Sequence, residues 1–163
     1  QPFAQTSNEE LLDWEVGRRL TWADFKAKPD QNSDAAASTA SILVISYNIS
    51  STGFTYKIKC SFSKTRSWGL HKTVYILSHE QGHFDIAEIF ARKLHKKMSE
   101  YRFNQRTFQK DLDKIYEEVL REKEKMQIDY DKETNHSINK EKQEVWLQKI
   151  EALLEAYKNY ADY

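Results

Sequence analysis

The sequence predicts an α+β fold in which a small N-terminal antiparallel sheet is followed by about three long helices. Two observations lead to this class. Strand and turn signals dominate before Leu70, and helical periodicity dominates after it. Strands followed by helices, rather than alternating with them, are typical of α+β proteins. The 163 residues suit one domain over residues 1–163, large enough to bury a core without disulfides.

The strand region is predicted to contain a hairpin. Residues 41–50 are rich in Ile, Val and Tyr, and residues 54–62 alternate apolar and polar side chains. Residues 51–53 form a short glycine-containing turn between them. Upstream, residues 20–25 are expected to form a short strand or edge segment, and residues 26–34, which include a proline, to form a loop.

Three later segments have apolar side chains at steps of three and four residues, as amphipathic helices do. The first helix is expected to begin near Leu70 and to include residues 76–94. The second and third patterns cover residues 108–119 and 145–157. The polar residues 127–139 are predicted to interrupt the last two helices, with Asp, Thr and Asn available as caps.

Composition excludes several classes of protein. Lys and Arg together number 25, as do Asp and Glu, so no basic excess points to a nucleic-acid partner. No apolar run approaches the ~18 residues of a transmembrane helix. The single cysteine, Cys60, excludes an internal disulfide and is expected to be buried and inert. Residues 1–5 do not form a signal peptide, although they would also fit what remains after cleavage. No pattern favours a particular oligomeric state.

The sequence His-Glu-Gln-Gly-His at residues 79–83 carries the chemistry. His79 and His83 are four residues apart, so on a helix they share one face and both can bind one zinc ion. Glu80 projects about 100° around the helix from His79, beside the ion rather than on it. There it can act as the general base toward a zinc-activated water. The alternative is an ordinary helix with two packed or exposed histidines and a salt-bridging glutamate.

A catalytic zinc usually has three protein ligands, so a third is needed outside this pentapeptide. His71 and His95 share the first helix with the pair and are too far along its axis, which leaves His136. Asp131 and Glu133 are acidic alternatives, as ligands or as partners of a ligand. Imidazole suits zinc, and we therefore favour His136 over the two acids. A polar connection that only caps two helices remains the competing interpretation.

Two further residues are candidates for supporting roles. Asp85 follows the pentapeptide and would either hydrogen-bond a ligand histidine or form a surface pair with Arg92 or Lys72. Tyr130 is a candidate donor to an oxyanion, a role that tyrosine fills in other enzymes.

These residues resemble a bacterial family of predicted secreted zinc-dependent proteases, the domain-of-unknown-function family 922. The resemblance lies in residues 79–85, in Ala-Arg-Lys-Leu at 91–94, in residues 20–25 and in Tyr-Asp-Lys-Glu-Thr-Asn-His at 130–136. The family signature usually closes with glycine, where this chain has Ser137. The resemblance implies a zincin-like metallopeptidase domain, one zinc ion, a signature that ends on the histidine at 136, and a secreted or periplasmic location.

The expected function is therefore a zinc-dependent hydrolase, and a metallopeptidase in particular. Water would attack a peptide carbonyl with zinc as Lewis acid and Glu80 as base. The edge of the predicted hairpin offers a place for an extended peptide or protein substrate. The alternatives are a binding or scaffold module with a structural or vestigial zinc, and a zinc amidase that acts on cell-wall material. The presence of Glu80 argues against a structural site, which needs no base.

Overall fold

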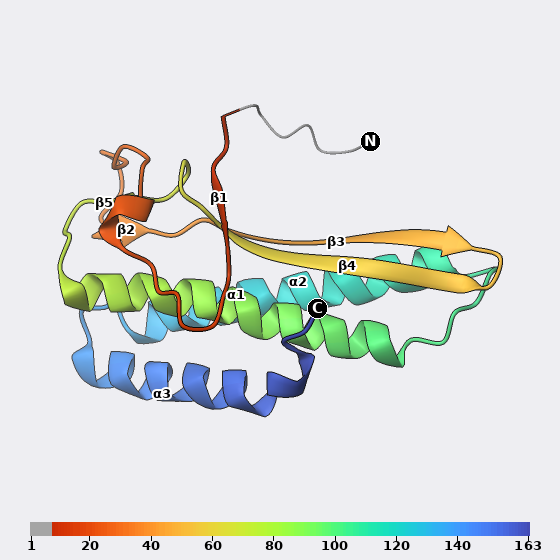
Figure 1. Ribbon diagram of the computed structural model, residues 1–163. Coiled ribbons are helices and arrows are strands. Elements are labelled where there is room, and N and C mark those ends of the chain that lie inside the picture. Colours follow the sequence, from red (N-terminus) through yellow and green to blue (C-terminus); the bar gives the residue numbers. More distant parts are fainter. Residues whose placement is uncertain (1–7) are drawn as a thin grey trace.

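The computed structural model describes residues 8–163 and places one long helix, α1, at the centre (Figure 1). Residues 1–5, considered above in relation to a signal peptide, lie outside the described residues. A long hairpin lies along one side of α1, α2 runs beside it, and α3 lies on the side away from the hairpin. The strands are β1 (Leu11–Asp13), β2 (Ala37–Ser38), β3 (Ser41–Ser50), β4 (Gly53–Ser63) and β5 (Trp68–Gly69), and the helices are α1 (Val74–Glu100), α2 (Phe108–Glu133) and α3 (Lys140–Ala156). The predicted α+β class is confirmed.

The predicted hairpin is confirmed as β3 and β4. The two strands pair antiparallel from Ser41↔Phe62 to Ser50↔Gly53, and β1 pairs with the other edge of β4. Gly53 has φ +143°, which a residue with a side chain rarely adopts, so it permits the tight turn. Cys60 is 2% exposed in β4, as expected, and burial raises the pKa of its thiol. The hairpin thus supplies the core face that packs on α1.

Helix α1 begins later than predicted, at Val74. The backbone N–H groups of Leu70 and His71 both donate to the carbonyl of Ala36, which holds this segment in the small sheet formed by β2 and β5. Thr73 then caps the helix by accepting a hydrogen bond from the N–H of Ile76. Because the hairpin, α2 and α3 pack around it, α1 is buried on several sides.

Two local predictions are wrong. Residues 22–24 form a short 3-10 helix rather than a strand, because Asp24 accepts from the N–H of Thr21 while its own N–H donates to the Thr21 carbonyl. Helix α2 also continues to Glu133, so the interruption between the last helices is confined to residues 134–139. The polar side chains after residue 126 include some that face α1 rather than solvent, and they do not end the helix.

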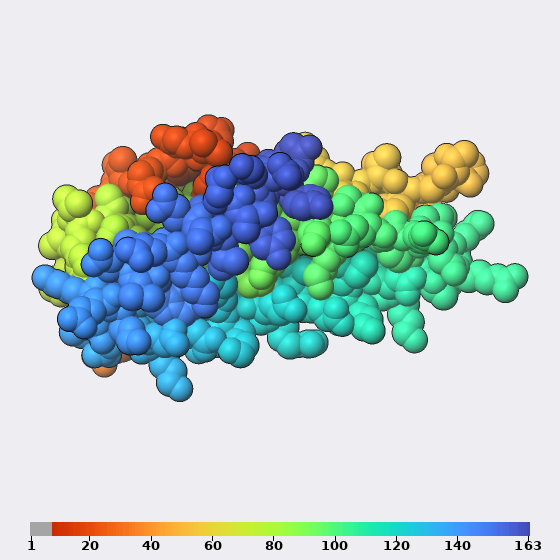
Figure 2. Space-filling view, turned by 90° about the horizontal axis from the view of Figure 1, so that it is seen from below, coloured from red at the N-terminus to blue at the C-terminus, as the bar shows by residue number. Residues whose placement is uncertain are grey.

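Helix α3 and the residues after it cover one end of the face seen in Figure 2. There α3 and the residues after it form one blue surface, while the yellow hairpin extends beyond them at the other end. None of the helices within residues 8–163 has both the length and the apolar character that a membrane crossing requires.

Candidate metal centre

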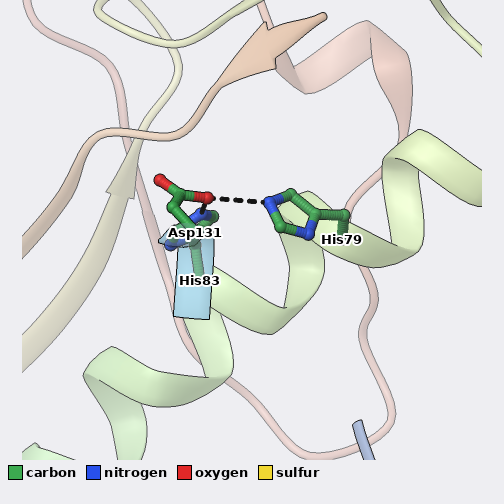
Figure 3. A group of neighbouring side chains, drawn as sticks. All are labelled: His79, His83 and Asp131. Atoms are coloured by element: carbon green, nitrogen blue, oxygen red, sulfur yellow. Dashed lines mark hydrogen bonds and ion pairs between the residues drawn. The ribbon is translucent and has the colours of Figure 1, made fainter. Parts of the chain in front are cut away.

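Three side chains from two helices converge on one point. His79 and His83 lie one turn apart on α1, and Asp131 faces them from α2 (Figure 3). Asp131 Oδ1 is 3.0 Å from His79 Nε2 and 2.8 Å from His83 Nε2. Ligand atoms that share one ion at bonds of about 2 Å lie about 3 Å apart in a tetrahedral site. These two distances suit one small divalent cation, and all three ligand atoms lie within 4.8 Å of one another.

The outer nitrogen of each imidazole is held by a glutamine. His79 Nδ1 lies 2.6 Å from Gln143 Oε1, and His83 Nδ1 lies 2.5 Å from Gln127 Oε1. The amide of Gln127 is oriented by its second hydrogen bond, in which Nε2 donates to the carbonyl of His83 at 2.9 Å. Its Oε1 is therefore the atom that faces the imidazole, and His83 must donate from Nδ1.

The same orientation is imposed on His79 through Tyr130. The hydroxyl of Tyr130 donates to the carbonyl of His79 at 3.0 Å, so it accepts from Gln143 Nε2 at 2.7 Å. Gln143 then presents Oε1 to His79 Nδ1, which acts as a donor. With both Nδ1 atoms donating, two Nε2 lone pairs face one carboxylate oxygen. Such a set of acceptors needs a cation between them, either a metal ion or protons.

The charges around the site reflect this convergence. Burial alone would lower the pKa of His83, but the hydrogen bond to Asp131 and the charges of Glu80 and Asp131 outweigh it and raise the pKa to about 9. Burial works against the ionised form of Asp131, yet its hydrogen bonds with His79 and His83 hold its pKa well below the ordinary value. The cluster thus favours positive charge beside a fixed carboxylate.

Glu80 lies next to the cluster in a pocket of about 170 Å³. The side chain is buried, and burial raises its pKa, although the neighbouring His83 and His79 lower it in part. Thr39 Oγ1 donates to Glu80 Oε1 at 3.3 Å from the opposite wall of the pocket. That wall is formed by residues 35–39, which include β2. Sequence analysis missed Thr39, because nothing in its local pattern marks it as a neighbour of α1.

His136, the first choice for the third ligand, lies outside the three-residue cluster. Its side chain is 63% exposed at the rim of the pocket, and its Nδ1 is 4.0 Å from Asp131 Oδ1. Asp131, the acidic alternative, occupies the third position because α2 continues through it and turns it toward α1. The backbone of Asn135, His136 and Ser137 has positive φ in a left-handed turn, the region that glycine favours. The usual family glycine would suit this turn, where the chain has Ser137.

Two acidic candidates are placed elsewhere. Glu133 Oε2 accepts from Trp146 Nε1 at 2.6 Å, so it connects α2 to α3 rather than to the cluster. Asp85 Oδ1 accepts from Trp14 Nε1 and from Gln81 Nε2, each at 2.9 Å. It is buried and bonded to neither histidine. These contacts correct the expectation that Glu133 binds the ion or supports a ligand. They also correct the expectation that Asp85 supports a ligand histidine or forms a surface pair.

Tyr130 also differs from its expected role. It is fully buried, and its hydroxyl is occupied by His79 and Gln143, so it does not face the pocket as an oxyanion donor. Its ring instead packs against both imidazoles, at centroid distances of 4.5 and 4.8 Å. Gln127 and Gln143 were missed entirely. The spacing of Gln127 and Asp131, four residues apart on one helix face, is the signal that would have indicated the first of them.

Among the other histidines, His95 bonds to Tyr56 and Asp162, and His71 lies exposed before the helix. Both are outside the cluster. His95 lies on α1 as expected, whereas His71 precedes the helix that it was expected to share with His79 and His83.

Comparison with known proteins places the chain in a family. Neither the curated proteins nor the solved structures gave a match. The family described as "Bacterial protein of unknown function (DUF922)" matches residues 18–137. That span contains the three cluster residues and Glu80, whereas Gln143 lies beyond it. Because the match extends over well more than half of the sequence, the chain belongs to this family.

Proposed function

We propose that the protein is a zinc-dependent hydrolase that cleaves peptide bonds. His79, His83 and Asp131 would hold the ion, and Glu80 would act as general base. The observation that carries the proposal is the convergence of two oriented imidazole acceptors and a carboxylate beside a buried glutamate in a pocket.

The donor set suits zinc. Two imidazole nitrogens and one carboxylate oxygen are common zinc ligands, and three protein ligands leave one coordination position open, as in catalytic sites. When bound, zinc acts as a Lewis acid that polarises a carbonyl group and lowers the pKa of water toward neutrality. A structural site would close the fourth position with protein and would have no need of Glu80.

Glu80 has the properties that a general base requires. Because burial raises its pKa, the carboxylate is a stronger base than an exposed glutamate. The hydroxyl of Thr39 holds Oε1 at the pocket wall, which limits the orientations of the side chain. We expect Glu80 to take a proton from the attacking water and to return it to the leaving amine of the peptide.

The wall of the pocket supports a peptide as the substrate. The carbonyl of Ala36, just before β2, accepts from Leu70 and His71, the two residues that follow β5. Strand β2 pairs only with β5 in this two-stranded sheet, so its other edge has no strand partner among the described residues, and residues 35–39 line the pocket. An extended peptide can pair with such an edge. We therefore propose substrate pairing at residues 35–39 rather than at the hairpin that the sequence suggested.

A location outside the cytoplasm, secreted or periplasmic, belongs to the proposal as well. It rests on the resemblance to predicted secreted proteases rather than on a feature of the fold.

The test compares the parent protein with Glu80→Gln after zinc reconstitution. Elemental analysis should find one zinc per chain in both, and a broad screen of fluorogenic peptides and proteins should find hydrolysis by the parent alone. Glu122→Gln, an exposed position on α2, serves as the matched control and should retain activity. Failure to bind any transition metal after reconstitution would end the proposal. Parental turnover by Glu80→Gln would remove Glu80 from the role of base.

A further inference from the structure

A second pocket continues the first one past Asp131. It has a volume of about 300 Å³ and shares Thr39, His83 and Asp131 with the pocket that holds Glu80. Its remaining wall lies between the start of β3 and the face of α2 that includes Lys123. A peptide that crosses the candidate metal centre along residues 35–39 would therefore enter this second pocket, which we call the α2 groove.

The two ends of this path differ chemically. Apart from the candidate metal centre and Glu80, the first pocket is lined by residues 35–39, Ile76, His136 and Ser137, which include no lysine or arginine. The α2 groove is instead lined by Lys123, which lies about two turns before Asp131 on the same helix. Glu124 also lines the groove, but it is exposed to solvent and lies outside ion-pair distance of Lys123.

Lys123 combines partial burial with the lack of an acidic partner. Within residues 8–163, no carboxylate lies within 4.0 Å of its ammonium, whereas Lys125 on the exposed face of the same helix pairs with Asp129 at 2.7 Å. Burial lowers the pKa of Lys123, although the neighbouring Cys60 and Glu124 oppose this in part. In the part of the chain that the structure describes, no fully buried side-chain nitrogen lacks a hydrogen bond, so the ammonium of Lys123, a residue that lines the groove, keeps some access to solvent. A bound anion would compensate for the water that the ammonium has lost.

We propose that Lys123 forms a substrate subsite for a carboxylate group. The carboxylate would belong to the part of the peptide that lies beyond Asp131, either as an Asp or Glu side chain or as the free C-terminus of the peptide. This inference rests on the proposed peptidase function, and it names the class of peptide that the site prefers.

The experiment measures peptide binding to the zinc-loaded Glu80→Gln protein, in which cleavage is expected to be blocked. The first set of probes is a series of ten-residue peptides, acetylated and amidated at their ends, with one Glu moved through the positions and Gln in matched controls. The second set has no acidic side chain and differs only in a free or amidated C-terminus. We expect one Glu position, or the free C-terminus, to strengthen binding about tenfold, as a charge-assisted hydrogen bond does.

Substitutions on α2 test whether Lys123 causes the preference for a carboxylate. Lys123→Gln should abolish it, and Lys123→Arg should retain it because the positive charge remains. Lys125→Gln, two residues away on the exposed face, is the matched control and should leave the preference unchanged. In the Glu80→Gln protein that keeps Lys123, high salt should reduce the preference if the contact is ionic, which tests the subsite even if Lys123→Gln does not fold.

The outcomes separate this inference from the proposed function. Equal binding of Glu and Gln peptides, together with equal binding of free and amidated termini, would overturn the carboxylate subsite even if the parent hydrolyses peptides. A preference that depends on Lys123 in a parent protein that cleaves nothing would support the subsite and count against the peptidase. A preference that persists in Lys123→Gln would overturn the assignment to Lys123. A failure to bind any of the peptides would overturn both.

Discussion

Gly82 of α1 lies directly against the ring of Tyr130 of α2. A Cβ atom on residue 82 would be 2.9 Å from Tyr130 Cζ and closer still to its hydroxyl. The ring fills this space, packs on the imidazoles of His79 and His83, and connects their helix to Gln143 by hydrogen bonds. The missing side chain at residue 82 therefore permits the close approach that brings Asp131 to the two histidines.

Gly82→Ala tests this relationship. Alanine favours a helix over glycine by about 1 kcal/mol, but overpacking a buried contact costs about 1–3 kcal/mol. We expect the overpacking to dominate, because the obstacle is the rigid ring of Tyr130. The free energy of unfolding, measured with urea in the presence of a chelator, should fall, and zinc affinity should fall as well. A variant with higher stability and unchanged zinc affinity would show that the contact does not hold the helices at this distance.

Zinc binding by two alanine variants would show whether Asp131 or His136 is the third ligand. Asp131→Ala removes an atom within 3.0 Å of both histidine nitrogens and should abolish measurable zinc binding. His136→Ala alters an exposed side chain at the rim, and zinc affinity should fall by no more than about tenfold, the lower end of the effect of a supporting residue. Asp129→Ala, two residues from Asp131 on a more exposed face, is the control. Zinc titrations would give the opposite order if His136 were the third ligand.

The sequence predicted the hairpin, the three helices and the pair of histidines because those features depend on local spacing. A period of two or of 3.6 residues, and two histidines four residues apart, are visible within a single segment. The identity of the third ligand depends instead on which face of α2 meets α1. The polar composition of residues 127–133 suggested a break, whereas the polar side chains of Gln127 and Asp131 face the histidines of α1.

Contacts between segments that are far apart in the sequence could not be predicted from local patterns. Thr39 meets Glu80 across 41 positions, and Gln143 meets His79 across 64. Neither residue belongs to a motif, and glutamine on a helix is ordinarily a surface residue. Tyr130 shows the same limit, since its hydroxyl was expected to face a substrate and instead donates to a backbone carbonyl inside the protein.

Gln143→Leu tests whether α3 takes part in the metal site. The substitution removes the acceptor for His79 Nδ1 and the donor to Tyr130, leaving both groups buried without that partner. We expect zinc affinity to fall by about 10–100-fold, as for other residues that orient a ligand histidine. Stability without metal should fall by about 1–3 kcal/mol. Gln148→Leu, on the exposed face of α3, is the control and should change neither zinc affinity nor stability. Equal zinc affinities for the two variants would show that α3 takes no part in the site.

The last prediction concerns a buried carboxyl group away from the metal site. Glu88 is 1% exposed and accepts hydrogen bonds from Tyr163 and, at 3.2 Å, from Arg92. Burial raises the pKa of Glu88 from 4.5 to about 7, although Tyr163 and Arg92 lower it in part and Asp85 raises it further. Between these values the folded protein holds a proton that the unfolded chain has released. The stability from this group is therefore fully present below about pH 4.5 and is lost as the pH rises through about 7.

Glu88→Gln cannot titrate and should not show this loss. The difference in unfolding free energy between variant and parent should shift in favour of the variant by about 1–3 kcal/mol as the pH rises from 4.5 to 8. Urea unfolding of both proteins across this range would measure it, with a chelator present so that protons at the metal site contribute equally to both. At a fixed pH the variant need not be the more stable protein, because it leaves the buried Arg92 without a charged partner. The prediction concerns how the difference in unfolding free energy between the two proteins changes with pH. Parallel pH profiles of the unfolding free energy would contradict a raised pKa for Glu88.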